Sequence, residues 1–208
     1  MRAKVRCARV ADSGPLAEFI PHEEGGTLVV KKILAVLSVF SAALLGLAGT
    51  AQAGIVQWSD GYESNPFGVW ERGIQGGDGH SWFDIGMGVA RTGNNNGWLF
   101  ADNGWSAMRT AKSLSSFPSN RSNCAAAIYA DPVGGGANIG LEIWDPNGWR
   151  KISHTVKWID DWAGYQLITL PNLNLNGVAT VYLQPIYGNN GGPAKYIRLD
   201  DAIIQCVY

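Results

Sequence analysis

The chain has 208 residues, with 16 Lys and Arg against 17 Asp and Glu, which gives a formal net charge of −1. No basic patch appears in residues 54–208. This balance argues against a nucleic-acid-binding protein, because such proteins concentrate Lys and Arg in one patch or stripe.

The segment before residue 54 has the pattern of an export signal. Lys31 and Lys32 precede an uncharged apolar run over residues 33–48, and Ala51-Gln52-Ala53 follows. A basic start, a short apolar run and an A-x-A site are typical of a secretory signal peptide. The alternative to a signal peptide is an N-terminal membrane anchor, but the apolar run is short for a helix that spans a membrane. We therefore expect a signal peptide over residues 30–53 and a secreted, extracellular protein with no stable membrane anchor after cleavage.

Residues 1–29 match neither a signal peptide nor a folded domain. The stretch Glu23-Glu24-Gly25-Gly26 is what a purine-rich ribosome-binding site gives when it is read as codons. A GTG start codon would read as Val when translated within a longer frame, and Val29 and Val30 follow this stretch. We hypothesise that translation begins there and that residues 1–29 are an upstream segment. A peptide from residues 5–25 in mass spectra of the precursor would contradict this.

Residues 54–208 are expected to form one domain held by one disulfide. They contain 10 Lys and Arg and 13 Asp and Glu, a formal charge of −3, and two of the three cysteines, Cys124 and Cys206. In an exported chain two cysteines most simply pair, and free thiols are the alternative. Closing a loop of about 80 residues stabilises the fold by roughly 4–5 kcal/mol in the chain-entropy model. Without a nearby histidine these cysteines do not suggest zinc.

Short apolar runs separated by Gly, Asn and Pro predict an all-β domain, either a sandwich or a barrel. In the run Ala179–Ile186, Val181 and Leu183 alternate with Tyr182 and Gln184, as on a strand with two different faces. Residues 145–148, Asp-Pro-Asn-Gly, read as a hairpin turn. The expected strands are Ile55–Trp58, Trp70–Arg72, Gly86–Ala90, Trp98–Ala101, Ser106–Ser113, Cys124–Ala130, Ile139–Trp144, Arg150–Ser153, Tyr165–Leu170, Ala179–Ile186 and Tyr196–Val207.

Two segments carry a resemblance to a known family. Residues 60–70 read Asp-Gly-Tyr-Glu-Ser-Asn-Pro-Phe-Gly-Val-Trp, and residues 197–206 read Ile-Arg-Leu-Asp-Asp-Ala-Ile-Ile-Gln-Cys. An aromatic-Glu pair followed by Trp, with an aliphatic-Asp-Asp-aliphatic last strand, resembles the galactose-binding-like jelly rolls. Many of these are carbohydrate-binding modules of secreted polysaccharide-degrading enzymes. The resemblance implies a jelly roll, a two-sheet antiparallel β-sandwich whose first and last strands lie side by side.

The resemblance also implies a structural calcium ion at the junction of those two strands. Glu63 matches the N-terminal acidic ligand of the family, and Asp200 or Asp201 the C-terminal one. Calcium takes six to eight hard oxygen ligands, which suits carboxylates from distant parts of a chain. The alternatives are an ion pair of Glu63 with Arg72 or Arg198, and a β-bulge or turn at Asp200-Asp201 with one solvated carboxylate.

The aromatic-rich composition of residues 54–208 predicts a polysaccharide or glycan as the partner. All 9 tryptophans and all 7 tyrosines lie in residues 54–208. Aromatic rings offer platforms for the apolar faces of sugars, and polar neighbours bind the hydroxyls. If their strands share one sheet face, the groove contains Tyr129, Glu142, Trp144, Tyr182 and Gln184. The alternative is burial, which we expect for Trp58, Trp70 and Phe83; Trp82, Trp98, Trp105, Trp149, Trp158 and Trp162 are left open between surface and core.

No catalytic set is apparent in the sequence. Glu142 and Asp145 do not form a carboxylate pair on one strand face, and neither His80 nor His154 lies in a Gln-x-His motif. No Gly-x-Ser-x-Gly elbow occurs. We therefore expect a monomeric, non-catalytic carbohydrate-binding β-sandwich with a structural calcium ion. The alternatives are a secreted structural or surface β-sandwich without sugar binding and a small polysaccharide lyase or hydrolase.

Overall fold

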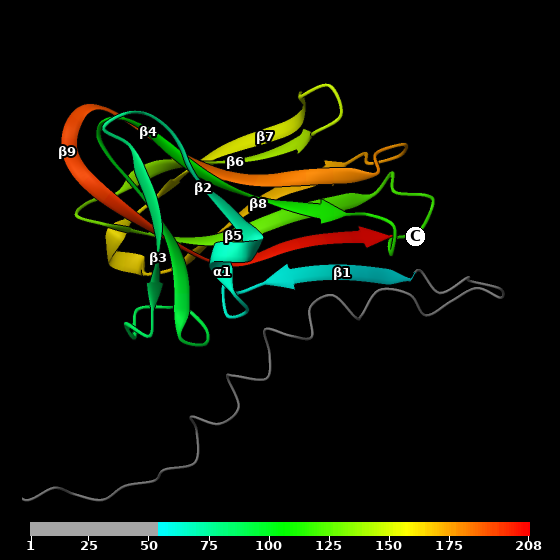
Figure 1. Ribbon diagram of the computed structural model, residues 1–208, viewed down its shortest axis with the longest axis horizontal. Helices are drawn as coiled ribbons and strands as arrows, with labels where there is room; N and C mark the ends of the chain where they lie inside the picture. The colour runs from blue at the N-terminus through cyan, green and yellow to red at the C-terminus, as the bar shows by residue number, and fades with distance from the viewer. Residues whose placement is uncertain (1–53) are drawn as a thin grey trace, which may run out of the picture. The chain divides into compact units, whose positions relative to one another are not determined.

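The computed structural model describes residues 54–208, so the predicted upstream segment, signal peptide and cleavage site lie outside the described residues. The described part consists of nine strands, one four-residue helix and one 3-10 turn (Figure 1). Their bounds are β1 Ile55–Asp60, α1 Pro66–Val69, β2 Trp70–Gly77, β3 His80–Ile85, β4 Asn95–Ser113, β5 Cys124–Val133, β6 Ala137–Asp145, β7 Arg150–Ile159, η1 Asp161–Ala163, β8 Gln166–Leu173 and β9 Thr180–Val207. No helix of this part is long and apolar enough to cross a membrane.

All strand pairings are antiparallel, and two long strands serve both layers of a sandwich. Residues 103–113 of β4 and 180–190 of β9 pair with each other and with β2 and β6, and β7 extends this first layer. Residues 95–101 of β4 and 195–207 of β9 form the second layer with β3, β5, β8 and β1. Figure 1 shows β4 and β9 bending from one layer to the other at one end. The expected β-sandwich is confirmed.

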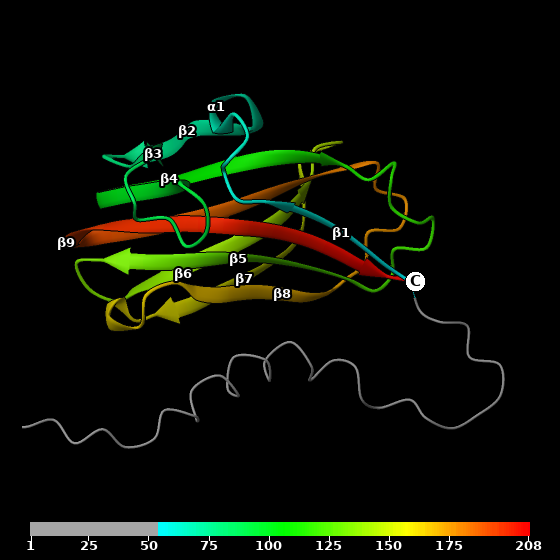
Figure 2. The same cartoon turned by 90° about the horizontal axis from the view of Figure 1, so that it is seen from below.

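The two ends of the domain lie side by side, as the resemblance implied. β1 runs antiparallel to the end of β9, with Ile55 opposite Val207 and Asp60 opposite Ala202 (Figure 2). The predicted disulfide is also confirmed. It joins Cys124 of β5 to Cys206 of β9, which face each other in the strand register.

The core lies between the two layers and is made by the inward side of each alternating strand. Leu141, Ile143, Val181 and Leu183 of the first layer are fully buried, whereas their sequence neighbours on the other side of the sheet form the outer face. The second layer contributes Leu99, Ile128, Ile168, Leu199 and Ile204. Trp70 and Phe83 are buried as expected, and Trp58 is partly buried against the core.

Some predicted strand boundaries are wrong. Residues 86–90 are not a strand, because Gly86 and Gly88 adopt φ values of 67° and 70° and start the loop between β3 and β4. β3 itself was missed. The two strands expected within 98–113 are one strand, β4, and the two expected within 179–207 are one strand, β9. The glycine-rich residues 191–194 bulge out between the β4–β9 pairs Asn103–Asn190 and Ala101–Lys195, so the ladder resumes after them.

Candidate functional site

The outer face of the first layer brings together four of the five residues predicted to bind sugar. Glu142 on β6 lies opposite Gln184 on β9, and Trp144 lies opposite Tyr182. Residues opposite each other in a sheet share a face, and the alternate residues Leu141 and Leu183 are in the core. The strand alternation seen in the sequence is therefore the cause of this cluster.

Glu142 is the polar centre of this face. Only 8% of its surface is exposed, and its carboxylate accepts three hydrogen bonds. The donors are Gln184 Nε2 at 3.0 Å, Trp144 Nε1 at 2.8 Å and Lys151 Nζ at 2.6 Å. Because two donors come from the neighbouring strands β7 and β9 and the third from β6 itself, they hold the carboxylate in one orientation. The half-exposed Lys151 ammonium is then positioned for a polar contact with a ligand.

An aromatic platform lies beside this polar centre. Trp149 follows the predicted turn at residues 145–148, is 56% exposed and stacks on Tyr182 with ring centroids 5.7 Å apart and planes at 30°. The Arg109 guanidinium lies 4.7 Å from the centroid of each ring. Glu71 fixes Arg109 through two hydrogen bonds, at 2.6 and 2.8 Å. The two rings and the guanidinium therefore form one continuous surface, and these contacts fix its geometry.

A shallow hollow of about 280 Å³ adjoins this platform. It lies between α1, β2, β4 and β9, and its lining includes Val69, Glu71, Arg109, Ala111 and Tyr182. A flat aromatic surface, an adjoining hollow and a fixed polar centre are the features of a site for a chain-like polar ligand. We call Tyr182, Trp149, Arg109, Glu142 and Gln184 the platform site.

Sequence reasoning missed Arg109, Glu71 and Lys151, and left Trp149 open. These residues join the site through cross-strand neighbours: Glu71 lies opposite Arg109, and Lys151 lies opposite Trp144. Opposite charges on two strands could have suggested the Glu71–Arg109 pair, but only with the strand register known.

The grouping of Tyr129 with the other four residues is wrong. Tyr129 lies on β5 in the second layer, opposite Asp200, and the Arg91 guanidinium lies 3.6 Å from its ring centroid. β5 pairs with the C-terminal part of β9, whereas Tyr182 and Gln184 lie in the first part. An alternating pattern indicates which side of a strand faces outward but not which layer the strand joins.

The Asp200-Asp201 pair holds the loop that joins β3 to β4. Asp200 is fully buried, and its Oδ2 accepts hydrogen bonds from the backbone N–H groups of Arg91 at 2.8 Å and Thr92 at 3.0 Å. Asp201 has a φ of 46° beside the shift in the β5–β9 register, and its carboxylate binds the Arg91 guanidinium and the Thr92 hydroxyl. Burial raises the pKa of Asp200 to about 6, although its backbone hydrogen bonds act in the opposite direction. The register shift at Asp200-Asp201 is the β-bulge given above as an alternative to calcium binding.

Glu63 binds the same loop from its other side. Its Oε1 accepts hydrogen bonds from the backbone N–H groups of Asn94 at 2.9 Å and Asn95 at 2.8 Å. The alternative partners, Arg72 and Arg198, do not bind it; Arg198 instead lies 3.4 Å from Asp131.

The acidic residues are thus brought to one loop, yet five of their six carboxylate oxygens already accept hydrogen bonds. Among residues 54–208 no group of three or more His, Cys, Asp or Glu side chains converges as metal ligands do. Arg91 already neutralises Asp201, so a calcium ion would have to compete with this cation. Calcium at Glu63, Asp200 and Asp201 stays a prediction.

The two histidines considered as catalytic residues lie far from each other in the topology. His80 is on β3 in the second layer, whereas His154 is on β7 in the first layer. The Asp145 carboxylate accepts hydrogen bonds from the Arg150 guanidinium and from the N–H of Asn147. Asp145 therefore lies at the turn and not on the sheet face that carries Glu142.

Comparisons with known proteins support the fold. No family model and no curated protein matches the sequence. Among solved structures, the CBM22-1–GH10 modules of Clostridium thermocellum xylanase 10B, complexed with xylohexaose, match with a TM-score of 0.50 and 12% identity over 71% of this chain and 28% of that one. The CBM22-1–CBM22-2 tandem of Paenibacillus barcinonensis Xyn10C matches with a TM-score of 0.50 and 12% identity over 73% and 46%.

A third structure, TmCBM61 in complex with β-1,4-galactotriose, has a TM-score of 0.48 and 11% identity, and the match covers 71% of this chain and 93% of that one. At 12% identity, the two matches with a TM-score of 0.50 show a shared fold. The chain has the β-sandwich fold of carbohydrate-binding modules, in agreement with the resemblance noted in the sequence.

Proposed function

We propose that residues 54–208 form a secreted, non-catalytic domain that binds a polysaccharide on the platform site. The single observation that carries this proposal is the stacked Trp149–Tyr182 pair beside the buried Glu142–Gln184 pair on one open sheet face. The two rings would contact the C–H face of a pyranose, and the polar pair would bind its hydroxyl groups.

The chemistry of Glu142 favours binding over cleavage. Its two oxygens accept hydrogen bonds from three protein donors, which suits a positioning role rather than that of an acid or nucleophile. The C. thermocellum structure of the same fold is complexed with xylohexaose, so xylan and xylohexaose are the first ligands to test.

Affinity electrophoresis in gels containing soluble polysaccharides, followed by calorimetry, tests the platform site. Tyr182→Ala and Trp149→Ala should each weaken binding at least about tenfold, because each removes one ring of the platform. Trp162→Ala is the matched control: Trp162 is 83% exposed in η1, which packs near β5 of the second layer. If no plant, fungal or bacterial glycan retards the protein, a structural sandwich without sugar binding is the better interpretation.

We also propose that the protein is exported and that calcium binds at Glu63, Asp200 and Asp201. Secretion is supported by the signal pattern before residue 54 and by the Cys124–Cys206 disulfide, since disulfides persist in oxidising compartments. The calcium proposal rests on the three carboxylates that meet at one loop. EDTA should lower the melting temperature and added calcium should restore it; an unchanged melt would remove the ion from this account.

A further inference from the structure

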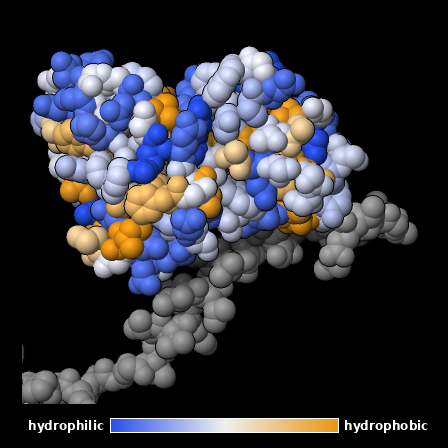
Figure 3. Space-filling view, viewed as in Figure 1, coloured by the Kyte–Doolittle hydropathy of each residue, from blue (hydrophilic) through white to orange (hydrophobic). Residues whose placement is uncertain are grey.

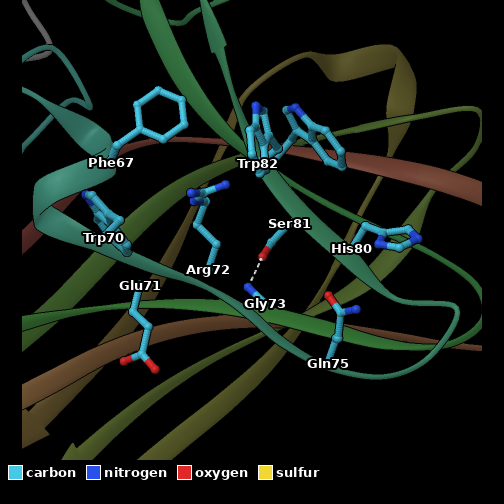
Figure 4. A pocket seen from close by; sticks show the side chains of 10 residues that line it. Phe67, Trp70, Glu71, Arg72, Gly73, Gln75, His80, Ser81 and Trp82 are labelled. Carbon is cyan, nitrogen blue, oxygen red and sulfur yellow. Dashed lines mark hydrogen bonds between the residues drawn. The ribbon is translucent and has the colours of Figure 1, made fainter.

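A second and larger hollow, of about 600 Å³, lies at the edge of the sandwich between β2 and β3 (Figure 4). Its lining includes Phe67 of α1, Arg72 and Gln75 of β2, and His80 and Trp82 of β3. Phe67, Trp70 and Glu71 border both this hollow and the smaller one beside Tyr182, so α1 and the start of β2 separate the two.

The walls of this edge hollow are apolar and accessible. Phe67 and Trp82 are each 47% exposed, and their rings meet edge to face with centroids 5.7 Å apart. The space-filling view in Figure 3 shows apolar side chains gathered where α1 and β3 lie in Figure 1. Half-exposed aromatic rings beside a hollow are suited to contact with the apolar face of a ligand.

Arg72 supplies a cation at the centre of the hollow. Its guanidinium carbon lies 3.8 Å from the Trp82 centroid and 5.0 Å from the Phe67 centroid, and Figure 4 shows the side chain directed between these rings. Among residues 54–208 it differs from the other arginines. Four of those bind a carboxylate, and Arg121 donates to three backbone carbonyls. The Arg72 guanidinium has neither kind of partner in this part of the chain.

The stacking of Arg72 on Trp82 leaves its charge available to a ligand. A guanidinium held by its flat face keeps its in-plane N–H groups free, and their geometry matches both oxygens of a carboxylate. Glu71, an acid in the same lining, is already bound by two nitrogens of Arg109. The positive charge of Arg72 is therefore not compensated by this neighbour.

We propose that the edge hollow binds a uronic acid residue of an acidic polysaccharide. Arg72 receives the carboxylate, Phe67 and Trp82 contact the C–H face of the sugar ring, and Gln75 and His80 bind its hydroxyl groups. A bare anion would leave the aromatic walls unused, and a neutral sugar would leave the guanidinium without a partner. This site uses side chains that the platform site does not use, so the two proposals can fail separately.

Calorimetry with oligogalacturonate and with the same oligosaccharide after reduction of its carboxyl groups tests the proposal. The wild-type protein should bind the acidic form at least about tenfold more tightly than the reduced form, and binding should weaken as salt rises. Arg72→Gln should remove this preference. Arg150→Gln is the matched control, since Arg150 is an exposed arginine paired with Asp145. Unchanged melting temperatures of both variants establish that the fold is intact.

Four outcomes would overturn the proposal. They are equal binding of the reduced form, retention of the acidic preference in Arg72→Gln, binding of sulfated but not carboxylated glycans, and no binding of uronate oligosaccharides. If the wild type binds xylohexaose but no uronate, the edge site is wrong and the platform site stands. If Tyr182→Ala abolishes neutral glycan binding and leaves uronate binding intact, both sites are supported as separate.

Discussion

Removal of the Glu142 carboxylate should destabilise the first layer as well as weaken ligand binding. In Glu142→Ala the donors Gln184 Nε2 and Trp144 Nε1 lose their shared acceptor. Gln184 is only 8% exposed, so its amide group cannot turn freely into water. An unsatisfied buried donor costs about 1–3 kcal/mol, whereas the half-exposed Lys151 can be solvated and adds less than about 1 kcal/mol.

Trp144 is only partly buried, so its donor adds at most about 1 kcal/mol. The sum is a loss of about 1–5 kcal/mol in the free energy of unfolding, measured by urea denaturation with tryptophan fluorescence. Glu142→Gln is the companion variant. Its amide oxygen can still accept from Gln184 and Trp144, and Lys151 can turn into solvent, so its cost should be about 1 kcal/mol. An alanine variant within about 0.5 kcal/mol of wild type, or equal costs for the two variants, would refute the reasoning about the buried donors.

Replacement of both Cys124 and Cys206 by alanine should lower the free energy of unfolding by roughly 4–5 kcal/mol, seen as a lower urea midpoint, because the bridge closes a separation of 82 residues; an unchanged midpoint would contradict this. In EDTA, stability should fall as pH rises from about 4 to about 6, since the pKa of Asp200 is about 6 in the folded state and about 3.9 unfolded. The folded state therefore binds the proton more tightly than the unfolded state. The free energy of unfolding should be higher by roughly 2–3 kcal/mol when Asp200 is protonated than when it is ionised. Asp200→Asn should lack this slope, and a slope of opposite sign in the wild type would disprove the assignment.

The parts of the site that follow from one strand could be predicted from the sequence. Tyr182 and Gln184 alternate with buried Val181 and Leu183, so the pattern alone places them on an outer face. The Cys124–Cys206 bridge could be predicted because residues 54–208 contain only these two cysteines and the signal pattern predicts an oxidising compartment.

The parts that depend on the register between strands could not be predicted. Tyr129 alternates with buried residues just as Tyr182 does, yet β5 belongs to the other layer. Arg109 lies 4.7 Å from both platform rings, although 40 residues separate it from Trp149. Residues 86–90 are apolar enough for a strand, but the positive φ values of Gly86 and Gly88 make them a loop.

The pairing of β1 with the end of β9 brings Gly54 and Tyr208 together, and their backbones exchange two hydrogen bonds, at 2.8 and 3.0 Å. A fusion partner or solid support joined to either residue would be tethered at the same corner of the domain. The outer surfaces of both sheets would then stay free for immobilised-ligand measurements. A short linker between these residues would also allow new termini to be opened in the glycine turn at residues 134–136 between β5 and β6.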